Sequence, residues 1–593
     1  MGANVFFVST GAVLDVTGTA AHAELIAAWR SRVERATRRF PWGPAHTVAR
    51  PHAGGVQLAI TAPYDQLFLA TEINEWALCA ALLAADPDRW GGLEAALRTE
   101  AVDNAVADSP ATGLPPVVEE AEALERFDHI AALESHPKLR RLLDAAAARF
   151  LPTVVDETIL TLGAGTGSRD FPLDALPAAS DIPWDELSDI PTAVVTGSNG
   201  KTTTVRLLAA CARAAGWRAG YNCTDGVYLD DEALASGDYS GPAGARRVLR
   251  DRRTQAAILE TARGGILRRG IAVTQASVAV VTNVSADHFG EYGVDNLTDL
   301  AVTKLTVGAA VRRSGVLVLN ADDPSLRVQA EELAGRFGQR PVLGWFSATT
   351  QSPHLAGYAA RGDLTCGVND GHLVLKHGRV AHDLGPIADM PLTLGGVATY
   401  NIANLAGAAL AALALAITPL AISEVFARFG ARIEDNPGRM MRFERDGVTV
   451  IIDYAHNPDG LRGFLKVASH LRRAGSRLAV ILGQAGNRQD ADVEELVQVT
   501  ASFHPDLVVV KENETQLRGR APGEMPRLIR TKLLRLGFSE AALPVESTEL
   551  DAARHALRWA RPGDVVALPM HISSARKALL AEIRDDGQLT PRL

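Results

Sequence analysis

The stretch that decides the fold reads Ala193-Val-Val-Thr-Gly197-Ser-Asn-Gly200-Lys201-Thr202-Thr203-Thr204. It predicts an apolar strand that enters a glycine turn and continues as a helix over 205–215. The glycines let backbone N–H groups approach phosphate oxygens closely, and the N-terminus of the helix adds a partial positive charge. A lysine and a hydroxyl follow in the order in which a phosphate loop uses them for the terminal phosphates and for Mg²⁺. We therefore predict a phosphate-binding loop.

The spacing of this loop differs from the common P-loop pattern. That pattern has four residues between its two glycines, whereas only Ser198 and Asn199 separate Gly197 from Gly200. The alternative is a glycine-rich turn between a strand and a helix that binds nothing. The position of Lys201 and the hydroxyls after the second glycine favours a variant phosphate loop over that alternative.

The composition indicates a globular chain of several domains. It has 593 residues, which corresponds to about three or four domains. With 60 lysine and arginine residues against 69 aspartate and glutamate residues, the formal charge is −9. A mildly acidic chain argues against a general nucleic-acid binder, and an aromatic content of 5% argues against base-stacking platforms. We expect no nucleic-acid partner.

The cysteines and the apolar runs favour a cytoplasmic protein. Four cysteines without CxxC spacing predict free thiols in a reducing compartment: Cys79, Cys211, Cys223 and Cys366. Residues 1–16 have no basic segment and no sustained apolar core, so they make a poor signal peptide. The most membrane-like run, 401–417, is rich in alanine and ends before Pro419, which favours a buried helix. We expect no membrane partner.

Three regions and one linker can be separated along the chain. Residues 1–155 mix strand-like runs with alanine-rich helical stretches, which predicts an α+β domain. A passage rich in Gly, Pro and Asp follows, and 156–191 is predicted to be a linker. In 192–422, short apolar runs that end at polar residues alternate with helices, which is typical of a parallel sheet covered by helices. Residues 423–593 repeat the pattern as a Rossmann-like domain, so the predicted fold class is multi-domain α/β.

Two predicted strand ends carry candidate metal ligands. The run Ala257-Ile-Leu-Glu260 ends in a carboxylate, where a P-loop enzyme has a second protein ligand for Mg²⁺. The run from Val280 to His288 ends in a polar cluster whose imidazole could ligate a metal. Alone, Glu260 would be a surface acid and His288 a loop histidine, but their order after a phosphate loop favours metal sites. Lys304, on the next helix, fits a solvated charge as well as a site residue.

The phosphate loop and the segments after it resemble the Mur ligases, the ATP-dependent amide-bond-forming enzymes of peptidoglycan synthesis. Residues 196–203 are similar to the TGxNGKTT nucleotide loop of that family. Further segments resemble its other motifs in the same order: Asn283 to His288, Asn320 to Pro324, Tyr400 to Asn404, Asn436 to Arg439 and Asp453 to Pro458. Together the matches cover about residues 192–593.

A narrower resemblance is to the Mur-like half of cyanophycin synthetase, which builds an aspartate backbone carrying arginine. The similar segments are Thr224 to Tyr228, Gly237 to Pro242, Leu259 to Arg268 and Leu517 to Arg520. Residues 56–85 are similar, more weakly, to the N-terminal domain of that enzyme. Cyanophycin synthetase has an ATP-grasp domain between these parts, whereas only 161–191 stand there in this chain.

The resemblance implies a reaction and a set of roles. ATP would activate a carboxylate as an acyl phosphate, and an amine would then displace phosphate to form an amide. The implied catalytic residues are Lys201, Glu260, His288 and Lys304, and the implied Mg²⁺ ligands are Thr202, Glu260 and His288. Lys304 resembles a position that is carbamylated in many Mur ligases. The implied ATP-binding residues are Gly197, Asn199, Gly200, Lys201, Thr202, Thr203, Asn404, Arg439, Asp453 and His456.

Arginines after the last motifs are candidates for binding a substrate carboxylate, because a guanidinium forms a planar fork that fits it. Arg518 and Arg520 are the first candidates, and Arg263 is a weaker one, with a solvated basic loop as the alternative. Glu512 and Glu514 could receive a cationic amine. The expected partners are an amino acid or peptide and a poly-amino-acid acceptor, and a homo-oligomer stays open.

Three functions compete on the sequence alone. The first is an ATP-dependent amide ligase that acts on an amino-acid, peptide or poly-amino-acid acceptor. The second is a non-catalytic ATP-binding module that regulates or binds a partner, which the intact set of Lys201, Thr202, Glu260 and His288 disfavours. The third is a kinase of a small acid, which the second α/β domain disfavours. Release of ADP that depends on an amine would separate the first from both others.

Overall fold

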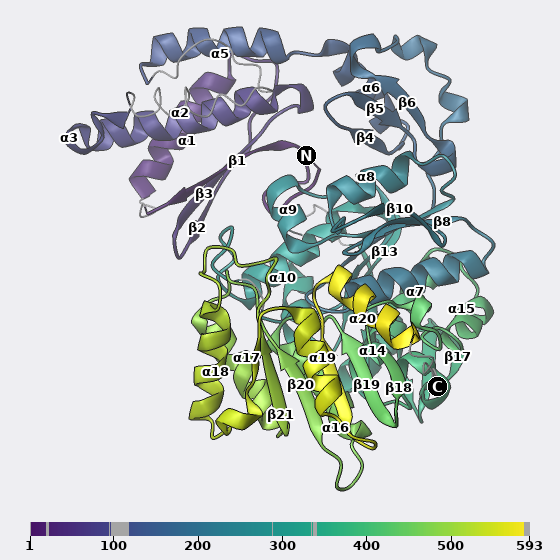
Figure 1. The fold of residues 1–593 in the computed structure, drawn as a ribbon. Helices are drawn as coiled ribbons and strands as arrows, with labels where there is room; N and C mark the ends of the chain where they lie inside the picture. The colour runs from purple at the N-terminus through teal and green to yellow at the C-terminus, as the bar shows by residue number, and fades with distance from the viewer. Residues whose placement is uncertain are drawn as a thin grey trace.

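The computed structural model describes residues 2–18, 23–93, 95, 118–286, 289–333, 335 and 341–585. These residues form four β-sheets with helices packed around them (Figure 1). The largest sheet lies in the middle of the chain, and a six-stranded sheet follows it. Two three-stranded sheets precede the large one in the sequence.

The first sheet belongs to an N-terminal α+β unit. Its antiparallel strands β1 (Gly11–Thr17), β3 (Gly55–Thr61) and β2 (Thr47–His52) lie in the order β1-β3-β2. The helices are α1 (Ala23–Thr37), α2 (Leu67–Ala85), α3 (Pro87–Trp90) and α5 (Glu120–Glu134). The buried Trp29 donates its Nε1–H to Asn74 Oδ1 at 2.9 Å, which satisfies the indole inside the core. Residues 64–85 would cross a membrane by length and composition, but half of the most apolar window is buried, as in a core helix.

The segment predicted to be a linker, 156–191, contributes two strands to the second sheet instead. Strands β4 (Thr153–Val155), β5 (Ile159–Leu162) and β6 (Arg169–Pro172) are antiparallel, and helix α6 (Pro137–Ala147) packs on them. Their shared core consists of Leu139, Leu142, Ala146, Val155, Leu160, Leu162, Leu176, Ile182 and Leu187. The strands are so short that Gly, Pro and Asp dominate the composition, so the sequence hides a folded unit.

The central sheet has the order β10-β9-β8-β11-β7-β12-β13-β14-β15-β16-β17 and is parallel from β8 through β15. This confirms the predicted parallel sheet. Its strands are β7 (Thr192–Thr196), β8 (Ala219–Cys223), β9 (Gly226–Leu229), β10 (Glu232–Ser236), β11 (Ala256–Glu260), β12 (Ala276–Val281), β13 (Val311–Asn320), β14 (Val342–Ser347), β15 (Leu364–Asn369), β16 (His372–His377) and β17 (Val380–Pro386).

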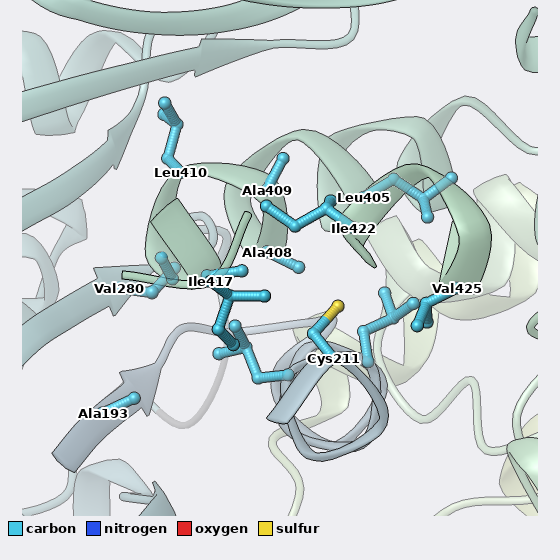
Figure 2. Packing of buried hydrophobic residues seen from close by; sticks show 14 of the residues in the cluster. Ala193, Cys211, Val280, Leu405, Ala408, Ala409, Leu410, Ile417, Ile422 and Val425 are labelled. Atoms are coloured by element: carbon cyan, nitrogen blue, oxygen red, sulfur yellow. The ribbon is translucent and has the colours of Figure 1, made fainter. Parts of the chain in front are cut away.

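Helices cover both faces of this sheet, because alternate side chains of each strand point to opposite faces. On β7, Ala193 and Val195 join one cluster, which includes α7 (Lys201–Ala214), α14 (Thr399–Ala414) and α15 (Pro419–Phe426). Val194 joins the other, which includes α8 (Pro242–Arg250), α9 (Arg263–Arg269), α10 (Leu297–Leu305) and α11 (Pro324–Gln329). Figure 2 shows Cys211 of α7 packed among α14 and α15 side chains. The predicted buried helix over 401–417 corresponds to α14 and is confirmed.

The C-terminal unit is a second α/β layer with the strand order β18-β19-β23-β20-β21-β22. Its strands are β18 (Met441–Arg445), β19 (Val448–Asp453), β20 (Leu478–Leu482), β21 (Leu507–Lys511), β22 (Val545–Glu546) and β23 (Val565–Pro569). Helices α16 (Pro458–Leu471), α17 (Asp490–Ser502) and α18 (Glu524–Arg535) cover one face, and α19 (Glu549–Trp559) and α20 (Ser573–Asp585) the other. This agrees with the predicted Rossmann-like architecture.

Arg250 at the end of α8 ties the small second sheet to the central unit, which predicts a pH-dependent contribution to stability. Its Nε donates to Thr161 Oγ1 at 2.9 Å, and its guanidinium pairs with Asp156. Burial alone would raise the pKa of Asp156, but Arg250 and backbone N–H groups outweigh it and lower the pKa from 3.8 to about 2. The pair therefore stabilises the fold fully above pH 4, and this contribution is lost as the pH falls toward 2.

We expect Arg250→Met to lower the free energy of unfolding by about 1 kcal/mol at pH 7. Chemical denaturation should show that the difference in unfolding free energy between wild type and variant narrows as the pH falls from 4 toward 2. Arg252→Met, on an exposed neighbouring arginine, should change the stability by less than about 0.5 kcal/mol. A gap that stays constant over this pH range would contradict the role given to Asp156.

Candidate functional site

Two cavities meet at the predicted phosphate loop, where the parallel strands of the central sheet end. The smaller cavity has a volume of about 720 Å³ and lies between the central and C-terminal units. The larger cavity has a volume of about 1110 Å³, and all three α/β or α+β units contribute to its lining. The two cavities share Ser198, Lys201, Thr224, Glu260, Tyr454 and His456. A group bound in one can therefore approach a group bound in the other at Lys201 and Glu260.

The phosphate loop joins β7 to α7, and its glycines are required by their surroundings. Gly197 has φ 150° and Gly200 has φ 84°. A Cβ on Gly197 would lie 1.8 Å from Thr282 Oγ1, and one on Gly200 would lie 2.2 Å from Asn404 Oδ1. Only glycine allows this close approach. Lys201 Nζ donates to the carbonyl oxygens of Gly197 and of Ser198, each at 3.0 Å, so the ammonium group lies over the loop.

Glu260 ends β11 beside the start of α7, where its carboxylate is fully buried. Thr202 Oγ1 donates to its Oε2 at 2.8 Å, and Thr224 Oγ1 donates to its Oε1 at 3.2 Å. Burial raises the pKa of Glu260, while the charge of Lys201 and the Thr202 hydrogen bond offset part of that effect.

The Thr202 hydroxyl and the Glu260 carboxylate are hard oxygen donors next to a phosphate loop, which suits Mg²⁺. In the part of the chain that the structure describes, no group of three or more His, Cys, Asp or Glu side chains could hold a metal ion. That is compatible with Mg²⁺, which commonly takes one or two protein ligands and completes its shell with phosphate oxygens and water. The donor set therefore fits the predicted magnesium site.

Of the two remaining predicted catalytic residues, His288 and Lys304, the structure describes only Lys304. His288 lies outside the described residues, so its role as a metal ligand stays a prediction. Lys304 on α10 is 3% exposed and lines the larger cavity together with Lys201 and Glu260. A solvated helical lysine is therefore excluded. Its carbamylation stays a prediction.

The smaller cavity gathers the other residues that the sequence assigned to ATP. Asn404 on α14 abuts Gly200 and donates its Nδ2–H to Asn401 Oδ1 at 3.0 Å. Asp453 at the end of β19 accepts hydrogen bonds from Met440 N at 2.7 Å and Ala455 N at 2.8 Å. The predicted nucleotide residues of both units thus line a single cavity: Asn199, Gly200, Lys201, Thr202, Thr203, Asn404, Arg439, Asp453 and His456.

Arg439 and a buried tyrosine add polar groups to this cavity. The Arg439 guanidinium lies 4.3 Å from the centre of the Tyr454 ring, so a cation–π contact holds it. The Tyr400 hydroxyl is buried and has no hydrogen-bond partner within the described ranges. A buried polar group without a partner is costly, which marks this wall of the cavity as a place for a polar ligand.

The phosphate loop is in direct contact with the C-terminal unit. Asn199 Nδ2 donates to Asp459 Oδ2 at 3.1 Å, and Asn199 Oδ1 accepts from Asn457 Nδ2 at 2.9 Å. Asn436 Nδ2 also donates to Thr203 Oγ1 at 3.2 Å. The structure therefore shows the two units closed over the smaller cavity.

The predicted substrate arginines separate into two groups. Arg263 and Arg518 line the larger cavity, where Arg263 pairs with Glu291 and Arg518 Nη1 donates to Asn487 Oδ1 at 3.3 Å. Arg520 lines neither large cavity. In the structure it donates to the carbonyl oxygens of Gly486 and Arg488 and pairs with Asp490 and Glu524. It therefore braces this loop, and its contact with a substrate carboxylate stays a prediction. The sequence Arg518-Gly-Arg520 does not indicate which of the two arginines lines the cavity and which one braces the loop.

The acidic residues expected to receive a cationic amine, Glu512 and Glu514, do not line the larger cavity. Glu512 accepts hydrogen bonds from Gly523 N and Asn513 N, and Glu514 is exposed outside the large cavities. The acidic residues that line the larger cavity are Asp15, Asp238, Glu260, Glu291 and Asp295. Asp15 comes from the N-terminal sheet, far away in the sequence, and no local pattern marks it.

The N-terminal sheet is a wall of the larger cavity. His52 Nε2 lies 2.9 Å from Asp15 Oδ1, and both residues line the cavity. The turn after β2 is fixed to the central unit because Ala53 N donates to Asp295 Oδ2 at 2.6 Å. Arg50 pairs with Asp299 at 2.9 Å. The same cavity is also lined by Arg488 and His571 of the C-terminal unit, which no sequence pattern marked as site residues.

Comparisons with known proteins agree with this arrangement. The profile of the Mur ligase middle domain matches residues 195–412, and that of the "Mur ligase, glutamate ligase domain" matches residues 438–568. Cyanophycin synthetase of Synechocystis sp. is 35% identical over 395 residues, which are 66% of this chain and 44% of that protein. UDP-N-acetylmuramoyl-L-alanyl-D-glutamate–2,6-diaminopimelate ligase of Geobacter metallireducens is 27% identical over 413 residues, 66% of this chain and 75% of that one.

Among solved structures, folylpolyglutamate synthase of Mycobacterium tuberculosis, complexed with ADP and AMPPCP, is similar at a TM-score of 0.48 and 16% identity. The similarity covers 66% of this chain and 91% of that one. The chain spans less than half the length of the cyanophycin synthetases that it matches.

The two ends of α7 allow the role of Gly200 to be tested with a matched control. Gly200 and Gly216 have φ 84° and 85°, but a Cβ on Gly216 would meet nothing within 4 Å. We expect Gly216→Ala to lower the free energy of unfolding by about 1 kcal/mol, because alanine avoids this conformation. Gly200→Ala should lower the free energy of unfolding by at least about 1 kcal/mol more than Gly216→Ala does, because the side chain of Asn404 must move to make room for the Cβ. Equal losses in chemical denaturation would contradict the close approach of Asn404.

Proposed function

The chain belongs to the Mur ligase family, and we propose that it is an ATP-dependent amide ligase that joins an activated carboxylate to an amino-acid amine. The observation that carries this proposal is the meeting of two cavities at Lys201 and Glu260. A phosphoryl group on a nucleotide in the smaller cavity would face a carboxylate in the larger one. Such an arrangement suits transfer of phosphate to the carboxylate, followed by attack of an amine.

In this proposal the smaller cavity binds ATP. The loop amides and Lys201 hold the phosphates, while Asn404 lies on the adenine side and Asp453 on the ribose side. Arg439, held over Tyr454, would contact a phosphate. Mg²⁺ bound through Thr202 and Glu260 would neutralise negative charge on the phosphates during transfer. His288 and Lys304 are proposed to complete the catalytic set.

The larger cavity is proposed to bind the carboxylate and the amine. Lys201, Lys304, Arg263, Arg488 and Arg518 give it cationic groups, which suit a carboxylate substrate and its acyl phosphate. The acidic residues lie in the same lining and suit a substrate that carries an amino group. The similarity to cyanophycin synthetase supports a peptide or poly-amino-acid acceptor related to cyanophycin.

Domain closure is part of the proposed mechanism. The hydrogen bonds between Asn199 and the residues Asn457 and Asp459 link the phosphate loop to the C-terminal unit. They must open for ATP to enter and ADP to leave, so open and closed forms are expected. We also propose a cytoplasmic location, because the four cysteines are free thiols.

The second candidate is a non-catalytic ATP-binding module that regulates or binds a partner. It requires only the smaller cavity and leaves the charged lining of the larger cavity without a role. The buried Lys304, which lines the larger cavity together with the shared Lys201 and Glu260, favours a catalyst over this module. A kinase of a small acid would need no amine site.

The release of ADP and phosphate tests the proposed function directly. With Mg²⁺ and ATP, release should require both an acceptor and an amine, and mass spectrometry should show one new amide. The acceptors to test are aspartate and glutamate peptides, β-aspartyl-arginine and cyanophycin primers, each with arginine, lysine and other amino acids. Lys201→Ala should lower the rate at least about 100-fold, because the ammonium stabilises charge in the transition state.

Each other outcome of this assay identifies a competing function. ADP release without an amine would indicate a kinase. Binding of ATP without turnover on any pair would indicate a binding module.

Arg518 allows a test of carboxylate binding. We expect Arg518→Ala to raise the KM for the carboxylate about tenfold while the KM for ATP stays unchanged, because a charge-assisted hydrogen bond is lost. Arg527→Ala, on an exposed arginine of α18 outside both cavities, is the matched control and should change neither constant. Equal KM values for wild type and Arg518→Ala would exclude this arginine from the carboxylate site.

A further inference from the structure

His571 follows β23 and lines the larger cavity together with Tyr454, His456 and Lys201. Its ring packs edge-on against Tyr454, with ring centres 5.4 Å apart. Its Nε2 lies 3.1 Å from the carbonyl oxygen of Ala455. Because a carbonyl oxygen can only accept a hydrogen bond, Nε2 carries the proton, and Nδ1 of the neutral ring is an acceptor.

The acceptor atom is accessible from the cavity. Within the described ranges, Nδ1 of His571 has no hydrogen-bond partner. It is also not among the fully buried polar atoms that lack a partner. Nδ1 therefore keeps some accessible surface, on a residue that lines the larger cavity.

A buried ion pair fixes the backbone that carries this ring. Lys511 and Glu549 are paired and have no exposed side-chain surface. Glu549 also accepts from His571 N at 2.9 Å and from Ile572 N at 2.8 Å, and Lys511 Nζ donates to Pro569 O at 2.9 Å. The pair thus holds the chain on both sides of His571, which leaves the imidazole little freedom.

The surroundings also keep the ring neutral. Burial lowers the pKa of His571 to about 3, and the positive charge of Lys511 adds to this effect against the opposing charge of Glu549. His456 and Tyr454 are the other titratable groups against the ring. At neutral pH the ring therefore offers a lone pair on Nδ1 and no positive charge.

We infer that His571 accepts, through Nδ1, a hydrogen bond from the attacking amine and so orients its nitrogen toward the activated carboxylate. This inference rests on the proposed function and deepens it, because it names the group that handles the amine. The lining also contains the carboxylates of Asp15, Asp238 and Asp295, which stabilise a cation. An ammonium ion has no lone pair and cannot attack, so a neutral acceptor is the group suited to the reactive form.

The proposed attack conserves protons and electron pairs. The ammonium form first loses one proton to water, and the neutral amine then donates its lone pair to the carbonyl carbon of the acyl phosphate. The bond between that carbon and the phosphate oxygen breaks, and its electron pair leaves with the phosphate. A second N–H proton passes to the departing phosphate. His571 holds the amine through a hydrogen bond during attack and needs to gain no proton.

Two substitutions of His571 distinguish a role in orienting the amine from a role in supporting the fold. His571→Gln can place an amide near the Nε2 position and keep the hydrogen bond to Ala455, but it removes the acceptor at the Nδ1 position. His571→Asn can place an amide oxygen near Nδ1. With an aspartate oligopeptide as acceptor and arginine as amine, we expect kcat to fall at least tenfold in His571→Gln. We expect His571→Asn to restore part of that loss.

Hydroxylamine supplies the second readout, because it is neutral at pH 7 and traps an acyl phosphate as a hydroxamate without arginine. We expect His571→Gln to form hydroxamate at the wild-type rate, with an unchanged KM for ATP. His470→Gln, on the exposed face of α16, is the matched control and should change neither rate.

The outcomes that would overturn this inference differ from those that would overturn the proposed function. An equal loss of hydroxamate and of amide formation in His571→Gln would show that His571 supports the fold or carboxylate activation. Unchanged amide formation would show that the amine does not use it. A wild-type protein that makes no hydroxamate in the presence of ATP and the acceptor would overturn the proposed function itself, and this inference with it.

Discussion

A buried carboxylate at the end of β11 is the constraint on which the rest of the site depends. Glu260 has no exposed surface, so its charge needs hydrogen bonds and a nearby cation. Thr202 supplies a hydrogen bond from the start of α7, Thr224 supplies another from the loop after β8, and Lys201 supplies the charge. These groups can meet because β8, β11 and β7 are parallel neighbours whose carboxyl ends share one edge of the sheet.

The same edge determines how the other units are arranged. The C-terminal unit closes on it through Asn199 and through Asp225, which pairs with Arg206 of α7 and Arg576 of α20. Burial raises the pKa of Asp225, but Arg439, Arg206 and Arg576 outweigh this effect and hold it below its ordinary value. In the closed arrangement, guanidinium groups therefore surround the carboxylate of Asp225. Separation of the two units would break the ion pair between Asp225 and Arg576 and expose both charges to water.

Local patterns predicted the parts of the structure that are local. The strand, glycine turn and helix around Lys201 are contiguous, so one stretch of sequence specifies the loop, and Glu260 ends a recognisable apolar run. The second sheet was missed because its strands are short and its core forms only when α6 and the later turns pack together. Arg518 and Arg520 could not be distinguished from the sequence because they share one neighbourhood, and only the fold shows which side chain braces the loop. His571 was missed because the contact of its Nε2 with Ala455 O, which leaves Nδ1 as the acceptor, and the hold of Glu549 on its backbone both arise only in the fold.

The proposed chemistry requires the larger cavity to bind both anionic and cationic groups. An anionic acceptor and an anionic nucleotide must approach each other, which explains Lys201 where the cavities meet and Arg263 in the larger cavity. A substrate that carries an amino group approaches as a cation, and the same lining provides Asp15 and Asp295 for it. Strong binding of the ammonium form would stabilise the unreactive state, so carboxylates alone cannot promote the attack. A neutral imidazole, kept unprotonated mainly by its burial and held in place by a buried ion pair, allows the cavity to attract a cation and still present a free amine.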